Sequence, residues 1–278
     1  MGRVTDRRRV VRIEADRITR RPDTLVTEEP LEIRVGGSPV TVTMRTPGDD
    51  FDLVAGFLTT EGVVTKPSEL LGLRYCLGKD DEGRHTYNVV DATLSEGTAA
   101  PSLDVTRNFY TTSSCGICGK ASLDAVRVAQ PYDVSTDPLH PSVATVVALP
   151  DRLREAQRVF DRTGGLHAAA LFTADGELRC LREDVGRHNA VDKVVGWALR
   201  EERLPLTGHI LMVSGRASFE LVQKALLAGL PMMVAVSAPS TLAVDLAADA
   251  GMTLVGFLRG DTMNVYAGAE RLDGVEAS

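Results

Sequence analysis

Between residues 209 and 257, short apolar runs alternate with segments whose apolar residues recur at helical spacing. The runs cover 209–213, 232–236 and 252–257. Gly229, Pro231 and Gly251 end the two helical segments that lie between the runs. This β-α-β-α-β pattern predicts a mostly parallel sheet with helices packed on it.

The loops that follow these strands should share one edge of the sheet. Parallel strands all end at the same edge, and open α/β sheets bind ligands there. The predicted helices begin near Ser218 and Ser240, and helix N-termini are ready anion sites. Ser-Gly-Arg at 214–216 resembles a phosphate cradle, but an ordinary tight turn fits it equally well.

The middle of the chain predicts a helix, a β-hairpin and a second helix. The first helix begins at Asp151, and Gly164 stops it. Strands at 166–172 and 178–181 flank the turn at Asp175-Gly176. The second helix has Val191, Val194, Val195, Ala198 and Leu199 on one face.

The N-terminal part predicts a hairpin, a helix and two further strands. Strands at 31–35 and 40–44 flank a glycine-rich turn, and strands at 71–77 and 85–92 follow the helix. That helix starts after Asp49 and ends at Gly62. Residues 1–24 are expected to form a flexible, solvated basic arm. Their arginines are not followed by the apolar segment of an export signal.

Composition narrows the class of protein. The chain has 278 residues, of which 44% are hydrophobic, and this is enough for one large domain or two ordinary ones. Its net charge of -7 argues against general nucleic-acid binding. Four cysteines are too few for a disulfide scaffold, and no apolar run approaches the roughly 18 residues of a membrane span. We therefore expect a cytoplasmic protein that binds neither nucleic acid nor membrane.

Two cysteines stand two residues apart in Thr-Thr-Ser-Ser-Cys-Gly-Ile-Cys-Gly-Lys (111–120), just before a helix predicted over 120–129. The positive end of that helix and Lys120 both favour the thiolate form. A thiolate at Cys115 or Cys118 can attack a sulfur donor, bind a metal or form a disulfide.

Two of these chemistries lack support in the rest of the chain. A zinc site needs two further ligands, and Cys76 and Cys180 are isolated in predicted strands, where a small buried side chain is expected. A thioredoxin-like redox pair lies at the start of a βαβ unit, whereas Cys115 follows a loop.

The charged segment Arg-Glu-Asp-Val-Gly-Arg-His-Asn (182–189) links the predicted hairpin to the next helix. His188 within it fits either a structural ion network or a catalytic acid–base role, and the network is favoured. His167 heads a predicted strand, where a buried structural histidine is the simpler interpretation.

Several long segments together resemble the formate dehydrogenase accessory sulfurtransferase family, FdhD. In chain order they are Thr-Pro-Gly-Asp (46–49), Gly-Phe-Leu-Thr-Thr-Glu-Gly (56–62), Ser-Ser-Cys-Gly-Ile-Cys-Gly (113–119), Thr-Gly-Gly-Leu-His-Ala-Ala-Ala-Leu (163–171), Arg-Glu-Asp-Val-Gly-Arg-His-Asn-Ala-Val-Asp-Lys (182–193), Ser-Gly-Arg-Ala-Ser-Phe-Glu-Leu-Val-Gln-Lys-Ala (214–225), Ser-Ala-Pro-Ser-Thr-Leu-Ala-Val (237–244) and Thr-Leu-Val-Gly-Phe (253–257). The resemblance extends over roughly residues 25–272.

The resemblance implies a fold as well as a family. That fold is a cytidine-deaminase-like, three-layer α/β core with a mostly parallel sheet, plus a smaller α+β N-terminal subdomain, usually in a homodimer. After the arm, we expect the subdomain over 25–130, ending in the Cys-x-x-Cys loop and its helix. The cofactor-binding core follows over 131–278.

The activity implied is that of a sulfurtransferase acting through a cysteine persulfide. Such a carrier takes sulfur from a cysteine desulfurase. It passes the sulfur to the molybdenum (or tungsten) bis(molybdopterin guanine dinucleotide) cofactor before this enters the formate dehydrogenase catalytic subunit. The resemblance points to Cys115 as the persulfide-bearing residue, with Cys118 assisting, and implies no metal bound by the protein itself.

The family's cofactor-binding segment maps onto Phe257, Leu258, Arg259, Gly260, Asp261 and Thr262. Family members often carry a basic residue where Thr262 stands, so that contact is either lost or supplied by Arg216 or Arg187. The alternative function is a chaperone that binds the molybdenum cofactor and whose cysteines are not catalytic. A redox sensor based on a Cys115–Cys118 disulfide would leave the downstream loops unexplained.

Overall fold

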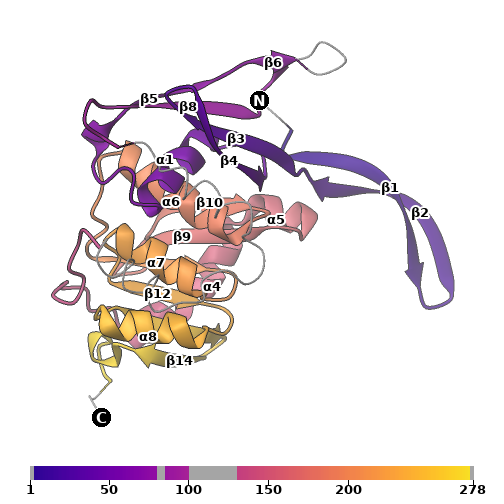
Figure 1. Cartoon of the computed structure of the whole chain (residues 1–278). Helices are drawn as coiled ribbons and strands as arrows, with labels where there is room; N and C mark the ends of the chain where they lie inside the picture. Colours follow the sequence, from indigo (N-terminus) through magenta and orange to yellow (C-terminus); the bar gives the residue numbers. More distant parts are fainter. Residues whose placement is uncertain (1–2, 80–84, 100–129, 276–278) are drawn as a thin grey trace.

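The computed structural model describes residues 3–79, 85–99 and 130–275, and a six-stranded sheet is the centre of this part of the chain (Figure 1). The strand order is β10-β9-β11-β12-β13-β14. The strands are β9 (His167–Thr173), β10 (Leu178–Asp184), β11 (His209–Val213), β12 (Met232–Ala235), β13 (Thr253–Arg259) and β14 (Thr262–Ala267).

The sheet is mixed, which corrects the expectation of a mostly parallel sheet. The predicted β-α-β-α-β unit is confirmed, because β11 pairs in parallel with β12, and β12 with β13. The other three pairings are antiparallel: β10 with β9, β9 with β11, and β13 with β14. Strand β14 was not predicted, although Met263 and Val265 alternate with Thr262 and Asn264, because the strand is short and none of its side chains is fully buried.

Helices cover both faces of this sheet and produce the expected three layers (Figure 1). One face holds α6 (Arg187–Arg200), α7 (Phe219–Leu227) and α8 (Thr241–Asp249), and the other face holds α4 (Val143–Ala156). A hydrophobic core lies on each face of the sheet, and successive residues of β11 point to opposite faces. Leu211 packs with α6 and α7 on one face, whereas Ile210 packs with α4 on the other. Both connections of the βαβαβ unit therefore pass over the same face.

The helix predicted to begin at Asp151 begins earlier, at Val143. Ser142 caps it by accepting a hydrogen bond from the Thr145 amide at 3.0 Å. Pro150 lies inside this helix, and its usual role as a helix breaker explains the wrong boundary. A separate short helix, α5 (Arg158–Thr163), ends at Gly164, which adopts a φ of 66°.

A second sheet, with strand order β4-β3-β8-β5, lies beside the first (Figure 1). It contains the predicted hairpin and packs against the predicted helix. The strands of this sheet are β3 (Glu29–Val35), β4 (Ser38–Arg45), β5 (Leu70–Tyr75) and β8 (Val89–Leu94), and the helix is α1 (Asp50–Thr60). The 3-10 turn η1 (Pro67–Glu69) precedes β5, and β6 (Gly78–Lys79) and β7 (His85–Thr86) form a separate short pair. At the other end of the chain, the 3-10 turn η3 (Ala269–Arg271) follows β14.

The two parts meet where α1 crosses α6 at backbone contact. A Cβ atom added to Gly56 would lie 1.7 Å from the Asp192 carbonyl oxygen, and one added to Gly196 would lie 1.8 Å from the Asp52 carbonyl oxygen. Asp52 of α1 pairs with Arg200 of α6 at this crossing, and its Oδ2 also lies 2.7 Å from Arg182 Nη2 of β10. The crossing therefore fixes the second sheet against the helical face of the first.

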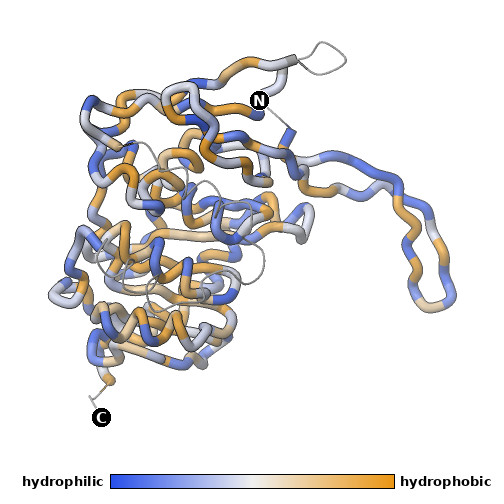
Figure 2. Tube along the Cα trace, viewed as in Figure 1, coloured by the Kyte–Doolittle hydropathy of each residue, from blue (hydrophilic) through white to orange (hydrophobic). Residues whose placement is uncertain are grey.

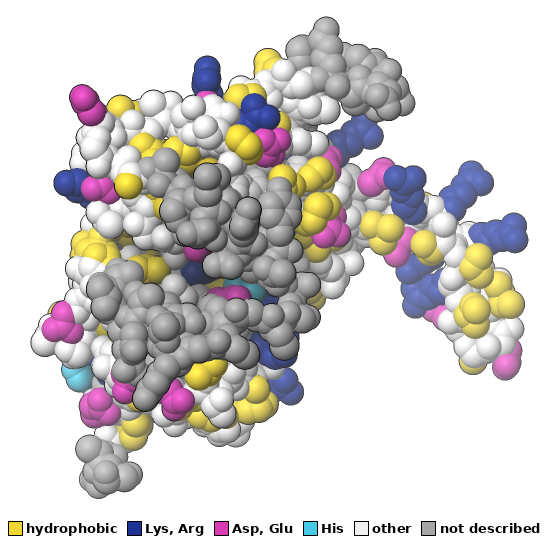
Figure 3. Space-filling view, in the orientation of Figure 1, with side chains coloured by type: hydrophobic (Ala, Val, Ile, Leu, Met, Phe, Trp, Pro, Cys, Tyr) yellow, Lys and Arg dark blue, Asp and Glu magenta, His cyan; other side chains and the backbone are white. Residues whose placement is uncertain are grey.

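Residues 1–24 were predicted to be a flexible arm, but the structure forms a β-hairpin there. Strands β1 (Thr5–Glu14) and β2 (Arg17–Val26) pair in antiparallel fashion and project from the body (Figure 1). Basic side chains, with three consecutive arginines at 7–9, and exposed apolar side chains such as Val11 and Ile13 are interspersed along the hairpin (Figures 2 and 3). Because the arginines are consecutive, the sequence shows no period-two strand pattern here. In the described part of the chain, no helix has the length and apolarity needed to cross a lipid bilayer.

Candidate functional site at the carboxyl edge of the central sheet

Three loops meet at the carboxyl ends of β11, β12 and β13, as their parallel order requires. The Ala217 amide donates to the Ala238 carbonyl at 3.2 Å, which joins the first loop to the second. The Phe257 amide donates to the Ser237 carbonyl at 3.2 Å, which joins the second loop to the third. The structure therefore brings together the segments 214–218, 237–240 and 257–262 that the sequence singled out.

A β-bulge shapes the third loop. The pairing of β13 with β14 shifts register between Gly256 and Arg259, and Phe257 in the bulge adopts a φ of 52°. The Phe257 side chain is 41% exposed, whereas Leu258 is fully buried. A Cβ on Gly256 would lie 2.9 Å from the Pro239 ring, so the second loop presses on the bulge. Backbone strain of this kind is characteristic of ligand sites.

The six residues expected to bind the cofactor occupy this bulge and the turn after it. All are exposed except Leu258, which can contribute only its backbone. Gly260 makes the turn with a φ of 55°. The Thr262 hydroxyl donates to the Arg259 carbonyl at 3.1 Å, and Arg259 Nε donates to the Val236 carbonyl at 3.4 Å. The Arg259 guanidinium is therefore held beside the loop after β12.

The charged segment 182–189 reaches the same edge, because β9 runs antiparallel to β11 and β10 antiparallel to β9, so the start of β9 and the end of β10 both lie there. The Ser214 hydroxyl accepts from the Ala168 amide at 2.9 Å, which joins the loop after β11 to the start of β9. Asp184 ends β10 next to His167, its partner in register. Sequence reasoning identified both segments separately, but no local signal showed that they would meet.

Most of the charges in segment 182–189 are used structurally, as the sequence analysis favoured. Asp184 Oδ2 lies 2.7 Å from Lys193 Nζ, and both side chains are almost fully buried. Glu183 accepts hydrogen bonds from the Val159 and Phe160 amides at 3.1 and 2.8 Å. His188 Nε2 lies 2.7 Å from Glu220 Oε2, and this contact lowers the pKa of the Glu220 carboxyl.

The edge carries a positive electrostatic field. Burial lowers the pKa of His167, and the nearby cation Arg187 and His188 lower it further. Arg216 and Arg259 add exposed guanidinium groups from the loops after β11 and β13. Of the carboxylates at this edge, Asp184 is matched by Lys193 and Glu220 lies against His188, whereas Asp261 is exposed in the turn after β13. The arrangement favours an anionic ligand.

The four cysteines fall into two groups. Cys115 and Cys118 lie outside the described residues. Cys180 on β10 is buried in the main core, as expected, and burial raises the pKa of its thiol to about 12, so it is protonated and unreactive at neutral pH. Cys76 is half-buried just after β5. Among residues 3–79, 85–99 and 130–275, no cluster of three histidine, cysteine or acidic side chains is arranged to hold a metal.

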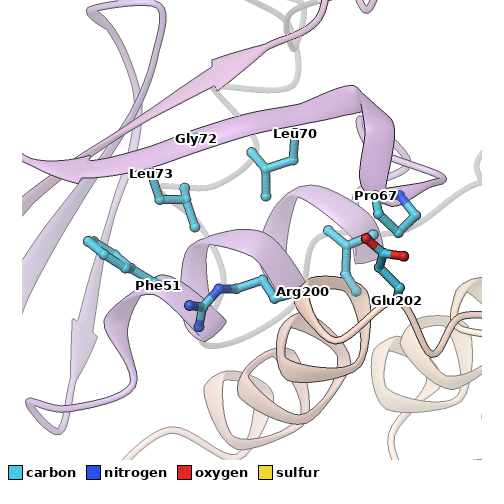
Figure 4. A pocket seen from close by; sticks show the side chains of 8 residues that line it. Phe51, Pro67, Leu70, Gly72, Leu73, Arg200 and Glu202 are labelled. Carbon is cyan, nitrogen blue, oxygen red and sulfur yellow. The ribbon is translucent and has the colours of Figure 1, made fainter.

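A separate cavity of about 380 Å³ lies far from this edge (Figure 4). Leu70 and Leu73 point into it from β5, and Phe51 and Arg200 lie on its opposite side. Arg200 sits at the C-terminal end of α6, whereas Arg187 starts that helix, so about 20 Å of helix separates them. Arg200 already pairs with Asp52. The cavity is therefore not part of the carboxyl-edge site.

Comparisons with known proteins agree on one family. The family model described as "FdhD/NarQ family" matches residues 26–273. The chain is 62% identical over 273 residues to the sulfur carrier protein FdhD of Streptomyces coelicolor, covering 98% of this chain and 97% of that protein. It is 59% identical over 276 residues to the sulfur carrier protein FdhD of Mycobacterium tuberculosis, covering 98% of this chain and 100% of that protein.

A solved structure has the same fold. It is the crystal structure of a protein from Desulfotalea psychrophila, provisionally described as a formate dehydrogenase accessory protein. The TM-score is 0.74 at 22% sequence identity, and the match covers 97% of this chain and 100% of that one.

Proposed function

The chain belongs to the FdhD/NarQ family, and we propose that it is a sulfur carrier that serves the maturation of formate dehydrogenase. The observation that carries this proposal is the 62% identity, over 98% of the chain, to a protein named as a sulfur carrier. The Cys-x-x-Cys pair before a predicted helix supports it, since a low-pKa thiolate is the group that accepts sulfur.

In the first step, the Cys115 thiolate attacks the terminal sulfur of a persulfide on a cysteine desulfurase. A bond forms between Cys115 Sγ and that sulfur, the donor's own sulfur–sulfur bond breaks, and the donor cysteine leaves as a thiolate. The exchange needs no external oxidant or reductant. Cys115 then carries the sulfane sulfur as a persulfide.

In the second step, the Cys118 thiolate attacks Cys115 Sγ, and the terminal sulfur leaves at the oxidation level of sulfide. The two electrons come from the cysteines, which become a Cys115–Cys118 disulfide, and a cellular thiol reduces it for the next cycle. The acceptor is the molybdenum bis(molybdopterin guanine dinucleotide) cofactor, which is the cargo of the protein and not its resident cofactor.

The carboxyl edge is the proposed site for that cargo. The exposed ring of Phe257 can stack on guanine, and Arg259 together with the backbone of Gly260 and Thr262 offers donors to its oxygen and phosphates. Leu258 anchors the loop in the core, and Asp261 completes the exposed turn. The strained bulge at Phe257 supports a binding role for this segment.

The finer architecture and setting belong to the same proposal. We place a cytidine-deaminase-like core at 131–278 and an N-terminal subdomain at 25–130, and we propose a cytoplasmic homodimer. The partners proposed are a cysteine desulfurase as sulfur donor and the formate dehydrogenase catalytic subunit as recipient. The alternative proposal is a chaperone that binds the molybdenum cofactor and whose cysteines do not react.

Replacing Cys115 with alanine is expected to reduce cellular formate dehydrogenase activity at least about a hundred-fold, because the group that forms the covalent intermediate is lost. The measurement is formate dehydrogenase activity in a strain whose own copy of this protein is deleted and then replaced by each variant.

Cys180→Ser serves as the matched control, because that thiol is buried and is expected to take no part in the reaction. Activity at the wild-type level in Cys115→Ala would favour the chaperone and contradict the sulfur carrier.

A further inference from the structure

The N-terminal hairpin, residues 3–26, projects from the body as an arm without a core of its own (Figure 1). Its strands pair without a register shift from Thr5 with Val26 to Glu14 with Arg17, over a length of about 30 Å. At the root, Val26 Cγ1 lies 3.2 Å from the position of a Cβ on Gly165. A two-stranded hairpin by itself is at best marginally stable in water. We therefore expect another molecule to cover the rest of the arm.

The two sides of the arm differ in charge. Directly paired residues of a hairpin lie on the same side, and neighbours along each strand alternate between the sides. All three acidic residues of the two strands, Asp6, Glu14 and Asp23, lie on one side. The opposite side, which we call the docking side, has no acidic residue and carries Arg7, Arg9, Val11, Ile13, Ile18 and Arg20.

The arginines of the docking side are not neutralised within the arm. On the acidic side, Arg8 Nη2 lies 2.8 Å from Asp6 Oδ2. In the described part of the chain, no carboxylate lies within ion-pair distance of Arg7, Arg9 or Arg20. The docking side therefore presents three uncompensated positive charges to other molecules.

Aliphatic side chains occupy the free end of the docking side. Ile13 and Ile18 form a cross-strand pair in which the residues are 69% and 71% exposed, and Val11 beside them is 55% exposed. Figure 3 shows apolar side chains at the end of the arm with basic side chains around them. Exposed apolar groups with a polar rim mark interaction surfaces. The chemistry of the docking side therefore fits a protein surface that is acidic and partly apolar.

The rest of the same chain has the complementary charge. Residues 1–26 contain eight arginines, no lysine and four acidic residues, which gives a net charge of +4. Because the whole chain carries -7, residues 27–278 carry -11. The arm projects away from the body to which it is attached (Figure 1). The acidic surface that is always present at the same concentration as the arm is therefore the body of a second copy.

We propose that the docking side of the arm binds the acidic body of a second copy of this chain. In a two-fold dimer each copy gives one arm and receives one, so the same contact forms twice. A hairpin side about 30 Å long and roughly 10 Å wide would then bury about 1,200 Å² in total, which is enough for a stable interface.

This inference deepens the homodimer of the proposed function, and it rests on that proposal. It names the element that holds the two copies together. Residues 1–25 precede the region 26–273 that the family model matches, so the family assignment does not supply this role.

The test is sedimentation equilibrium of the purified full chain over a range of concentrations. The wild type is expected to dimerise, and salt should weaken the dimer because the arginines are exposed. The double change Arg7→Glu and Arg20→Glu is expected to weaken dimerisation at least about ten-fold, because like charges then meet. The matched control, Arg12→Glu with Arg21→Glu, changes the net charge equally on the other side of the same strands and should dimerise nearly as the wild type does.

A second measurement keeps the test valid if the charge changes unfold the arm. Benzoylphenylalanine, a photoreactive amino acid, in place of Ile18 is expected to give a covalent dimer on illumination, attached to a peptide from residues 27–278 of the second copy. The same amino acid in place of Thr19 lies on the other side of the arm and should give little covalent dimer. Attachment of position 18 only within its own chain would overturn the proposal.

The outcomes are distinct from those of the proposed function. Dimers of the Arg7→Glu and Arg20→Glu variant as tight as those of the wild type would overturn the arm contact and leave the homodimer standing. A monomeric wild type would overturn the arm contact and the homodimer, and would leave the sulfur-carrier proposal standing. A monomer that binds vesicles of anionic phospholipid through Arg7 and Arg20 would overturn the second copy as the occupant and assign the docking side to a lipid surface.

Discussion

Replacing Gly196 with alanine is expected to lower the free energy of unfolding by about 3 kcal/mol or more. The new methyl group would lie 1.8 Å from the Asp52 carbonyl oxygen and 2.4 Å from the Gly56 amide nitrogen, so α1 and α6 would have to move apart. Inside an ordinary helix the same change stabilises by up to about 1 kcal/mol, which makes a loss here diagnostic of the crossing. Urea denaturation followed by circular dichroism measures the effect.

Gly72→Ala is the matched control for the Gly196 prediction. Gly72 lies on the exposed edge strand β5, where no atom lies within 4 Å of an added Cβ, so we expect the unfolding midpoint to stay or rise slightly. Equal midpoints for Gly196→Ala and the wild type would show that the two helices do not cross at backbone contact.

Replacing Lys224 with methionine is expected to lower the free energy of unfolding by about 3–5 kcal/mol, because the buried carboxylate of Asp192 loses the cation that pairs with it. Lys224 Nζ lies 2.9 Å from Asp192 Oδ1 and 2.8 Å from the Thr60 hydroxyl, and it joins α7 to both α6 and α1. The second change Asp192→Asn should recover part of the loss by removing that charge. The measurement is the free energy of unfolding of the two single variants and the double variant in urea.

The pH dependence of this effect has a defined sign. Burial alone would lower the pKa of Lys224, but Asp192 and Glu61 outweigh burial and raise that pKa. The stability that charged Lys224 contributes to the wild type is therefore fully present below pH 10.5 and is lost as the pH rises through the pKa of Lys224 in the folded state. Burial raises the pKa of Glu61 and Lys224 lowers it, so without Lys224 that pKa rises further and the folded variant binds more protons than the unfolded chain above about pH 4.5. The deficit of Lys224→Met should therefore shrink on acidification.

Lys66→Met is the surface control for Lys224→Met. The Lys66 side chain is 66% exposed and its nitrogen lies 3.8 Å from Glu69, so its removal should cost less than about 1 kcal/mol at any pH. A Lys224→Met variant as stable as Lys66→Met would contradict the buried network.

Local patterns in the sequence were sufficient for the β11–α7–β12–α8–β13 unit. Each of its strands is a short apolar run, each helix has an apolar face, and Gly229 and Gly251 mark the turns. The same signals failed at the N-terminal hairpin, where three consecutive arginines followed by Val10 and Val11 give no alternating pattern, and where the strands have no core to face. They failed again at α4, where Pro150 inside the helix suggested a boundary.

The position of the site was predictable in part, because it depends on the same β-α-β-α-β pattern. Parallel strand order alone places the loops after β11, β12 and β13 together, and the resemblance supplied the segment from Phe257 to Thr262. The approach of Arg187 to Gly215 was not predictable, because it depends on β9 pairing with β11 across a long sequence separation. The α1–α6 crossing was not predicted for the same reason, because Gly56 and Gly196 are far apart in the sequence and only the folded structure shows that they lie at one contact.

We propose that this chain carries sulfur on Cys115. The most direct test is the intact mass of the purified protein after incubation with cysteine and a cysteine desulfurase, beside Cys115→Ala, Cys118→Ala and the buried-thiol control Cys180→Ser. We expect a gain of about 32 Da, one sulfur atom, that a thiol reductant removes and that only Cys115→Ala abolishes. A wild-type protein that gains no sulfur, or a Cys115→Ala variant that gains as much as the wild type, would contradict it.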